Sequence, residues 1–62
     1  MEQEKIKARC EAMRAELGIP ATKFCQNISL STGSYHDWRR NKTTFSEKRL
    51  NSIDEYLKKY GF

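Results

Sequence analysis

The sequence predicts a small all-α domain of four to five helices. Apolar residues recur at helical spacing in the segments that begin and end the chain, and no segment alternates as a half-buried strand does. The chain has only three glycines and one proline in 62 residues, so few residues interrupt its predicted helices. A chain of this length has room for one small core, so we expect residues 1–62 to form a single domain.

The first predicted helix covers residues 2–17. Charged residues occupy most of its faces, and Gly18 follows it as a glycine that ends a helix in the left-handed conformation. Its apolar residues share one stripe at the helical period and are expected in the core: Ile6, Cys10, Met13 and Leu17.

Two short helices are expected next, with a tight turn between them. Pro20 suits the start of the first, because the N–H that proline lacks would be unpaired there. This helix is expected to end near Asn27. Ser31 is the expected N-cap of the second. Tyr35 and Trp38 lie three residues apart, and we expect them to point into the core instead of stacking on single-stranded nucleic acid.

Residues 41–44 are expected to form a loop before the last helix, which Ser46 caps and Gly61 ends. Tyr56 and Phe62 fall beside the apolar stripe of this helix and are candidates for a self-association surface. The stripe itself comprises Leu50, Ile53, Leu57 and Tyr60.

The chain carries a net charge of +4, and most of the excess lies in its second half. A cluster of basic residues there includes only one acidic residue in its sequence, Glu47. Such a cluster suits binding to phosphate groups, and a solvated basic surface is the alternative. The cluster comprises Arg39, Arg40, Lys42, Lys48 and Arg49.

Cys10 and Cys25 fall at apolar positions and are predicted to be reduced thiols in the core. Their spacing and the single histidine do not make a zinc site, so we expect no metal and no cofactor. We also expect no enzyme and no small-molecule substrate, since catalytic triad spacing and a glycine-rich phosphate loop are both missing. With no membrane-spanning stretch and no signal peptide, the expected location is cytoplasmic.

Residues 19–42 carry a motif of defined residue types at fixed spacing. It consists of Phe24-Cys25, Ser29, Leu30-Ser31, Tyr35, Trp38 and Asn41-Lys42. This pattern resembles the helix-turn-helix of the Cro and CI phage-repressor family. The resemblance implies a lambda-repressor-like bundle whose helix-turn-helix spans residues 20–40 approximately.

Four positions depart from the family pattern. Pro20 and Ala21 stand where the family has an N-cap serine and a glutamine that commonly touches DNA, so one expected contact is missing. Ser29 and Asn41 stand where the family has a turn glycine and a loop glycine. Asparagine tolerates the left-handed conformation that such a loop requires.

The resemblance implies that the second helix of the motif enters the major groove of double-stranded DNA. Arg40 suits a guanine, while Arg39 and Lys42 suit phosphates. Asp37 reads a cytosine, pairs with Arg40 or Arg39, or stays clear of DNA; His36 faces DNA or solvent. The expected DNA-binding residues are Ser31, Thr32, Gly33, Ser34, His36, Asp37, Arg39, Arg40 and Lys42, with Lys23, Lys48 and Arg49 as further candidates.

Two functions are consistent with this sequence. The first is transcription regulation of phage or mobile-element type, with a homodimer on operator DNA that associates through the last helix and residues 60–62. The second is a protein-interaction module, such as an antirepressor, that keeps the fold without binding DNA. Ala21, Gly33 and Asp37 favour the second function, because each weakens the expected DNA surface.

Overall fold

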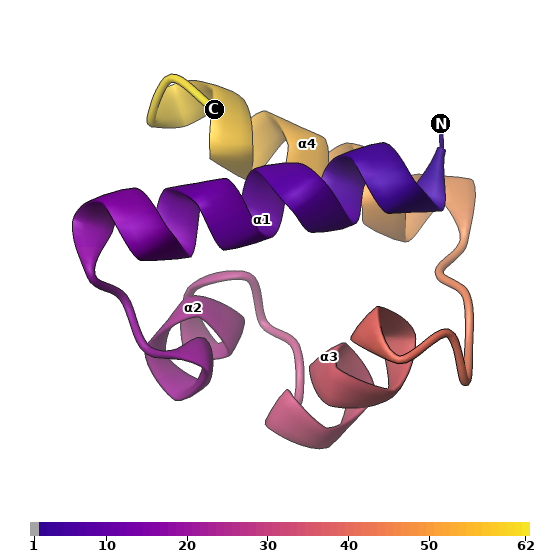
Figure 1. Cartoon of the computed structure of the whole chain (residues 1–62). Helices are drawn as coiled ribbons and strands as arrows, with labels where there is room; N and C mark the ends of the chain where they lie inside the picture. The colour runs from indigo at the N-terminus through magenta and orange to yellow at the C-terminus, as the bar shows by residue number, and fades with distance from the viewer. Residues whose placement is uncertain (1) are drawn as a thin grey trace.

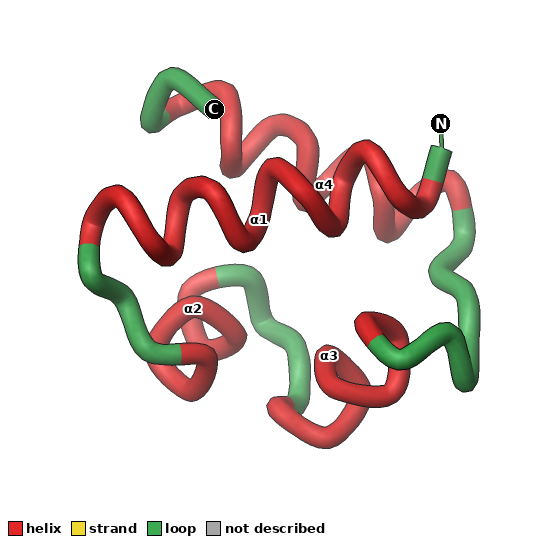
Figure 2. The backbone as a smooth tube through the Cα atoms, viewed as in Figure 1, coloured by secondary structure: helices red, strands yellow, loops and turns green. Residues whose placement is uncertain are grey.

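The computed structural model describes residues 2–62, which form four helices and, over that range, no strand. The helices are α1 (Gln3–Leu17), α2 (Ala21–Asn27), α3 (Thr32–Arg39) and α4 (Glu47–Lys59). α1 and α4 pack side by side, and the pair of α2 and α3 lies on the other side of α1 in the view of Figure 1. Short loops join successive helices (Figure 2). The predicted all-α fold class is confirmed.

Serine side chains begin α3 and α4, as the sequence predicts. The Oγ of Ser31 accepts a hydrogen bond from the N–H of Ser34 at 3.1 Å, and the Oγ of Ser46 accepts one from the N–H of Arg49 at 3.2 Å. Each bond satisfies one of the N–H groups that have no partner in the first turn of a helix. Pro20 precedes the first residue of α2 in an extended conformation.

Four residues adopt the left-handed backbone conformation at the ends of helices and in turns. Gly18 and Gly61 follow α1 and α4 with φ of 66° and 81°. Ser29, in the turn between α2 and α3, has φ of 57°, and Asn41, after α3, has φ of 64°. The backbone therefore turns left-handed at both positions where the family pattern has glycine, although these residues carry side chains.

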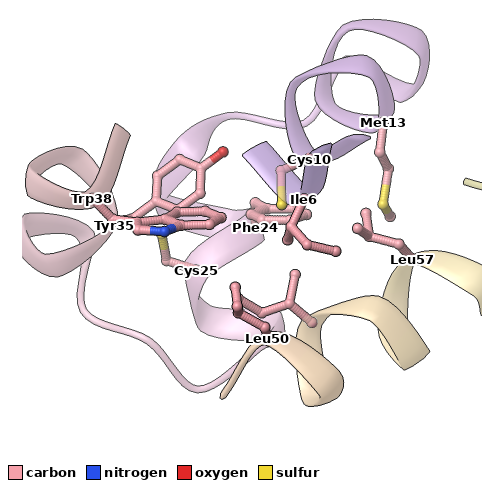
Figure 3. Close-up of a cluster of buried hydrophobic side chains, with 10 residues drawn as sticks. Ile6, Cys10, Met13, Phe24, Cys25, Tyr35, Trp38, Leu50 and Leu57 are labelled. Atoms are coloured by element: carbon pink, nitrogen blue, oxygen red, sulfur yellow. The ribbon is translucent and has the colours of Figure 1, made fainter. Parts of the chain in front are cut away.

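All four helices contribute to one hydrophobic core (Figure 3). Tyr35 and Trp38 are fully buried, which confirms their predicted inward direction. Cys10 and Cys25 are free and buried, as predicted for small core side chains. The core comprises Ile6, Cys10, Met13, Phe24, Cys25, Tyr35, Trp38, Leu50, Ile53 and Leu57.

The predicted stripes are wrong at their C-terminal ends. Leu17 is 49% exposed and Tyr60 is 52% exposed. Leu17 is the last residue of α1, and Tyr60 follows the last residue of α4, so neither reaches the core between the helices. Conversely, Tyr56 and Phe62, which the sequence analysis names as candidates for a self-association surface, are partly buried and pack against the core cluster. Within residues 2–62, no helix is long and apolar enough to cross a membrane.

Candidate nucleic-acid interface

One face of α3 is exposed because the other face is anchored in the core. The hydroxyl of Tyr35 donates a hydrogen bond to Glu11 at 2.7 Å, and the indole Nε1 of Trp38 donates one to Gln3 at 2.6 Å. Both partners lie on α1, so the buried aromatic rings and their polar atoms fix the rotation of α3 about its axis. The face turned away from α1 carries Gly33, Ser34 and Asp37, which are exposed, and His36, which is partly exposed.

Two of the small polar residues at the start of α3 already have partners. Ser31 caps the helix and also donates its hydroxyl hydrogen to the Oγ of Ser34 at 2.8 Å. Thr32 is partly buried, so its side chain is less open to a ligand than that of Ser34. The hydroxyl of Ser34 accepts the bond from Ser31 and keeps its own hydrogen for a ligand. Ser34 is therefore the hydroxyl best placed to donate outward.

Arg39 has a partner on α1 that the sequence analysis did not identify. Its guanidinium lies 3.3 Å from a carboxylate oxygen of Glu11 and 5.9 Å from the centre of the Tyr35 ring. A guanidinium over an aromatic face and beside a carboxylate is held by two attractive interactions. The structure thus directs Arg39 across the helix toward α1, and a phosphate would compete with Glu11 for it.

Arg40 and Lys42 extend from the C-terminal end of α3 into the following loop. Both are exposed, and neither side chain takes part in an ion pair within residues 2–62. The pair between Asp37 and Arg40, one alternative for Asp37, is therefore not formed in this described range. The backbone carbonyl of Asp37 instead accepts a hydrogen bond from the N–H of Lys42 at 2.9 Å, which folds the loop back against the end of α3.

A second basic surface lies at the start of α4, directly after this loop. A hollow there is lined by Ser46, Lys48, Arg49 and Ser52. Arg49 lies 6.0 Å from the centre of the Phe45 ring, and the hydroxyl of Ser52 donates to the carbonyl of Lys48 at 3.3 Å. The residues of the predicted basic cluster are therefore not all on one surface. Arg39 turns toward α1, whereas Arg40, Lys42, Lys48 and Arg49 lie along the loop and the start of α4.

Glu11 is the polar centre of the contact between α1 and α3. Partial burial raises the pKa of its carboxyl group, but the hydrogen bonds from Tyr35 and Arg14 and the charges of Arg14 and Arg39 outweigh burial, and the net pKa is lowered. Glu11 is consequently an anion at neutral pH. The sequence analysis missed Glu11, although it lies next to Cys10 on the flank of the apolar stripe.

The sequence analysis also missed Gln3 and Lys7, which contact the loop after α3. The helical spacing of these two residues could have indicated that they pack against another part of the chain. Gln3, Lys7, Cys10 and Arg14 follow the helical period along the edge of the apolar stripe, so the first two fall on the face that packs.

The buried thiols lack the environment of reactive cysteines. Burial raises the pKa of Cys10 to about 12, and it also raises the pKa of Cys25. Both thiols are therefore protonated at neutral pH, whereas a nucleophilic cysteine reacts as the thiolate. Among residues 2–62, no three histidine, cysteine, aspartate or glutamate side chains gather as a metal site would require.

No family model matches the chain, and no curated protein or solved structure matches it significantly.

Proposed function

We propose that this chain binds double-stranded DNA in a sequence-specific manner and regulates transcription, as a helix-turn-helix protein of phage-repressor type. The observation that carries the proposal is that an anchored α3 is followed by two cations that form no ion pair within residues 2–62. α3 is fixed to α1 by Tyr35 and Trp38, its outward face is polar, and the exposed Arg40 and Lys42 follow it. A short helix presented in this way has the dimensions and chemistry to enter a major groove.

The proposed contacts divide by their chemistry. Ser34 and the first N–H groups of α3 donate to base edges or phosphates at the front of the helix. Arg40 offers a planar fork that matches the O6 and N7 acceptors of guanine. Lys42 and the basic residues at the start of α4 neutralise phosphates, which supports affinity without reading sequence. Such a protein acts in the cytoplasm and needs neither cofactor nor small-molecule substrate.

A single domain of this size makes few base contacts, so the proposal includes binding as a homodimer to two half-sites. Tyr60 and Leu17 are large apolar side chains that are about half exposed, and they support a surface for self-association. Sedimentation that gives a monomer at every concentration, with and without DNA, would count against the dimer.

The experiment that tests the function is selection from a pool of random duplex DNA at two salt concentrations. We expect an enriched palindromic motif and an affinity that falls steeply with salt. The Arg40→Ala variant is expected to bind the selected duplex about tenfold more weakly or worse, and to lose base specificity at one position of the motif. Lys5→Ala is the matched control, because it removes an equal charge from an exposed position of α1 that lies outside both the proposed DNA-binding surface and the proposed self-association surface.

A protein-interaction module is the second candidate, and the exposed acid on α3 favours it. Asp37 faces outward without an ion-pair partner in the described chain, and a carboxylate near phosphates is repelled. On this alternative, a protein with basic side chains binds the α3 face. Failure of the chain to bind any duplex at low salt would favour this candidate and overturn the proposal of DNA binding.

A further inference from the structure

The loop between α3 and α4 (residues 40–46) is attached at two points to the first turns of α1. Figure 1 shows the N-terminal end of α1 beside this loop, although the two segments lie far apart in the sequence. One attachment joins Lys7 to Asn41, and the other joins Gln3 to Phe45. Both involve polar side chains of α1 that are not members of the hydrophobic core cluster.

Lys7 places a buried charge at the first attachment. Only 10% of its side chain is exposed, and its Nζ donates to the Oδ1 of Asn41 at 2.6 Å and to Glu4 at 3.3 Å. The same ammonium group lies 5.6 Å from the centre of the Trp38 ring. A buried ammonium group is costly unless it is fully hydrogen-bonded, so Asn41 is an integral partner. The bond also restrains the residue with the left-handed backbone, where the chain leaves α3.

Gln3 holds the other end of the loop through both halves of its amide. Its Nε2 donates to the carbonyl of Phe45 at 2.9 Å, and its Oε1 accepts from the N–H of Phe45 at 3.2 Å. The same Oε1 accepts the bond from Trp38. The Phe45 ring stacks on Trp38 with ring centres 4.6 Å apart, so the end of the loop is tied to α1 and to α3 at once.

The residues between the two attachments are the ones turned to solvent. Lys42, Thr43 and Thr44 are exposed, and Arg40 directly precedes Asn41. A loop that is already ordered before it meets a ligand avoids the entropy cost of becoming ordered on binding. Two anchored ends, with one lysine and two threonines between them and Arg40 beside the first, therefore make a preorganised loop for an anionic ligand.

We infer that Gln3 and Lys7 are positioning residues that hold the 40–46 loop ready for the phosphate backbone of duplex DNA. This inference rests on the proposed function. Lys7 acts through Asn41 and does not touch DNA, because its ammonium group is buried beneath the loop. The sequence motif assigns no role to either α1 residue.

The test compares two lysines of α1 that carry the same charge. Lys7→Met keeps a long unbranched side chain at this buried position and removes the donor to Asn41. Lys5→Met is the matched control: the side chain of Lys5 is 79% exposed, and within residues 2–62 its one ion pair is with Glu2 at 3.8 Å. With both variants folded, Lys7→Met is expected to bind duplex DNA about three- to tenfold more weakly than Lys5→Met. Equal affinities would overturn the inference.

A double-mutant cycle separates positioning from general loss of structure. Asn41→Gly keeps the left-handed backbone and removes the acceptor of the Lys7 bond. The variant with both Lys7→Met and Asn41→Gly is expected to bind no more weakly than the weaker single variant, because both changes break one interaction. Losses that multiply would show independent effects and overturn the inference. Asn41→Gly also tests it alone if Lys7→Met does not fold.

Hydrogen exchange without DNA distinguishes this inference from the proposed function. The N–H groups of Asn41 and Lys42 are bonded to carbonyls of α3, and their exchange reports whether the loop is ordered. Exchange at least about tenfold faster in Lys7→Met than in Lys5→Met supports positioning, and unchanged exchange overturns it. Absence of duplex binding by the unaltered chain would overturn the proposed function, whatever the exchange experiment shows.

Discussion

Glu11 shows how one partly exposed carboxylate joins two helices. It accepts hydrogen bonds from Tyr35 on α3 and from Arg14 on α1, and it pairs with Arg39. These partners favour the charged form strongly enough to lower the pKa in spite of partial burial. A similar group occurs at Asp54, where hydrogen bonds from Arg9 and Lys58 lower the pKa of the carboxyl group.

Because the folded state lowers the pKa of Glu11, the unfolded state binds more protons in acid, and stability falls there. The contribution of Glu11 is complete above the unfolded pKa of about 4.3 and disappears as the pH falls through the lower folded value. We predict that Glu11→Gln lowers the free energy of unfolding by about 1 kcal/mol at pH 7. Urea titrations at pH 7 and pH 3 measure it, and the difference from the unaltered chain is expected to shrink at pH 3.

The control for this residue is Glu16→Gln, an exposed position on the same helix. This change is expected to leave the unfolding free energy within about 0.5 kcal/mol at both pH values. A gap between Glu11→Gln and the unaltered chain that stays the same from pH 7 to pH 3 would contradict the assignment.

The turn between α2 and α3 holds a serine in a conformation that suits glycine. Ser29 has φ of 57°, which costs a residue with a side chain roughly 1–2 kcal/mol. We predict that Ser29→Gly raises the free energy of unfolding by about 0.5 kcal/mol, since the greater entropy of unfolded glycine offsets part of the gain. Ser29→Ala keeps the strain and is expected to give no increase. Chemical denaturation measures both, and a Ser29→Gly variant less stable than Ser29→Ala would contradict the prediction.

Ser29 and Asn41, the two non-glycine residues with a left-handed backbone in the described chain, differ in the hydrogen bonding of their side chains. Ser29 has no side-chain hydrogen bond in the described chain, whereas Asn41 accepts one from Lys7. Asn41→Gly therefore relieves strain but removes a charge-assisted bond, and no gain in stability follows from it. The left-handed conformation thus serves only the local turn at Ser29, whereas at Asn41 it belongs to a residue that also makes a tertiary contact.

At the scale of the whole molecule, local patterns predicted the fold better than the candidate site. The caps at Ser31 and Ser46 and the buried Tyr35 and Trp38 depend on residues within one turn, which the sequence displays directly. The exposed Leu17 was mispredicted because a periodic stripe does not show where a partner helix ends.

The contacts that decide which cations are free lie between residues distant in the sequence. Lys7 and Asn41 are 34 positions apart, and Arg9 and Asp54 are 45 apart. Helical periodicity places such residues on a face but does not say which face of another helix they meet. The ion pair of Arg39 with Glu11 therefore becomes evident only once α1 is packed against the other helices. The same holds for Arg40 and Lys42, which form no ion pair among the residues that the structure describes.

The most direct test of the proposed function is a map of amide chemical-shift changes in the ¹⁵N-labelled chain during titration with duplex DNA recovered from the selection. We predict that the shifts concentrate in residues 32–37 and 40–44 and at the start of α4, while the exposed positions Ala8 and Ala12 of α1 remain unchanged. Shifts absent at low salt, or confined to Leu17 and Tyr60, would contradict the assignment of the α3 face and its loop as a DNA-binding surface.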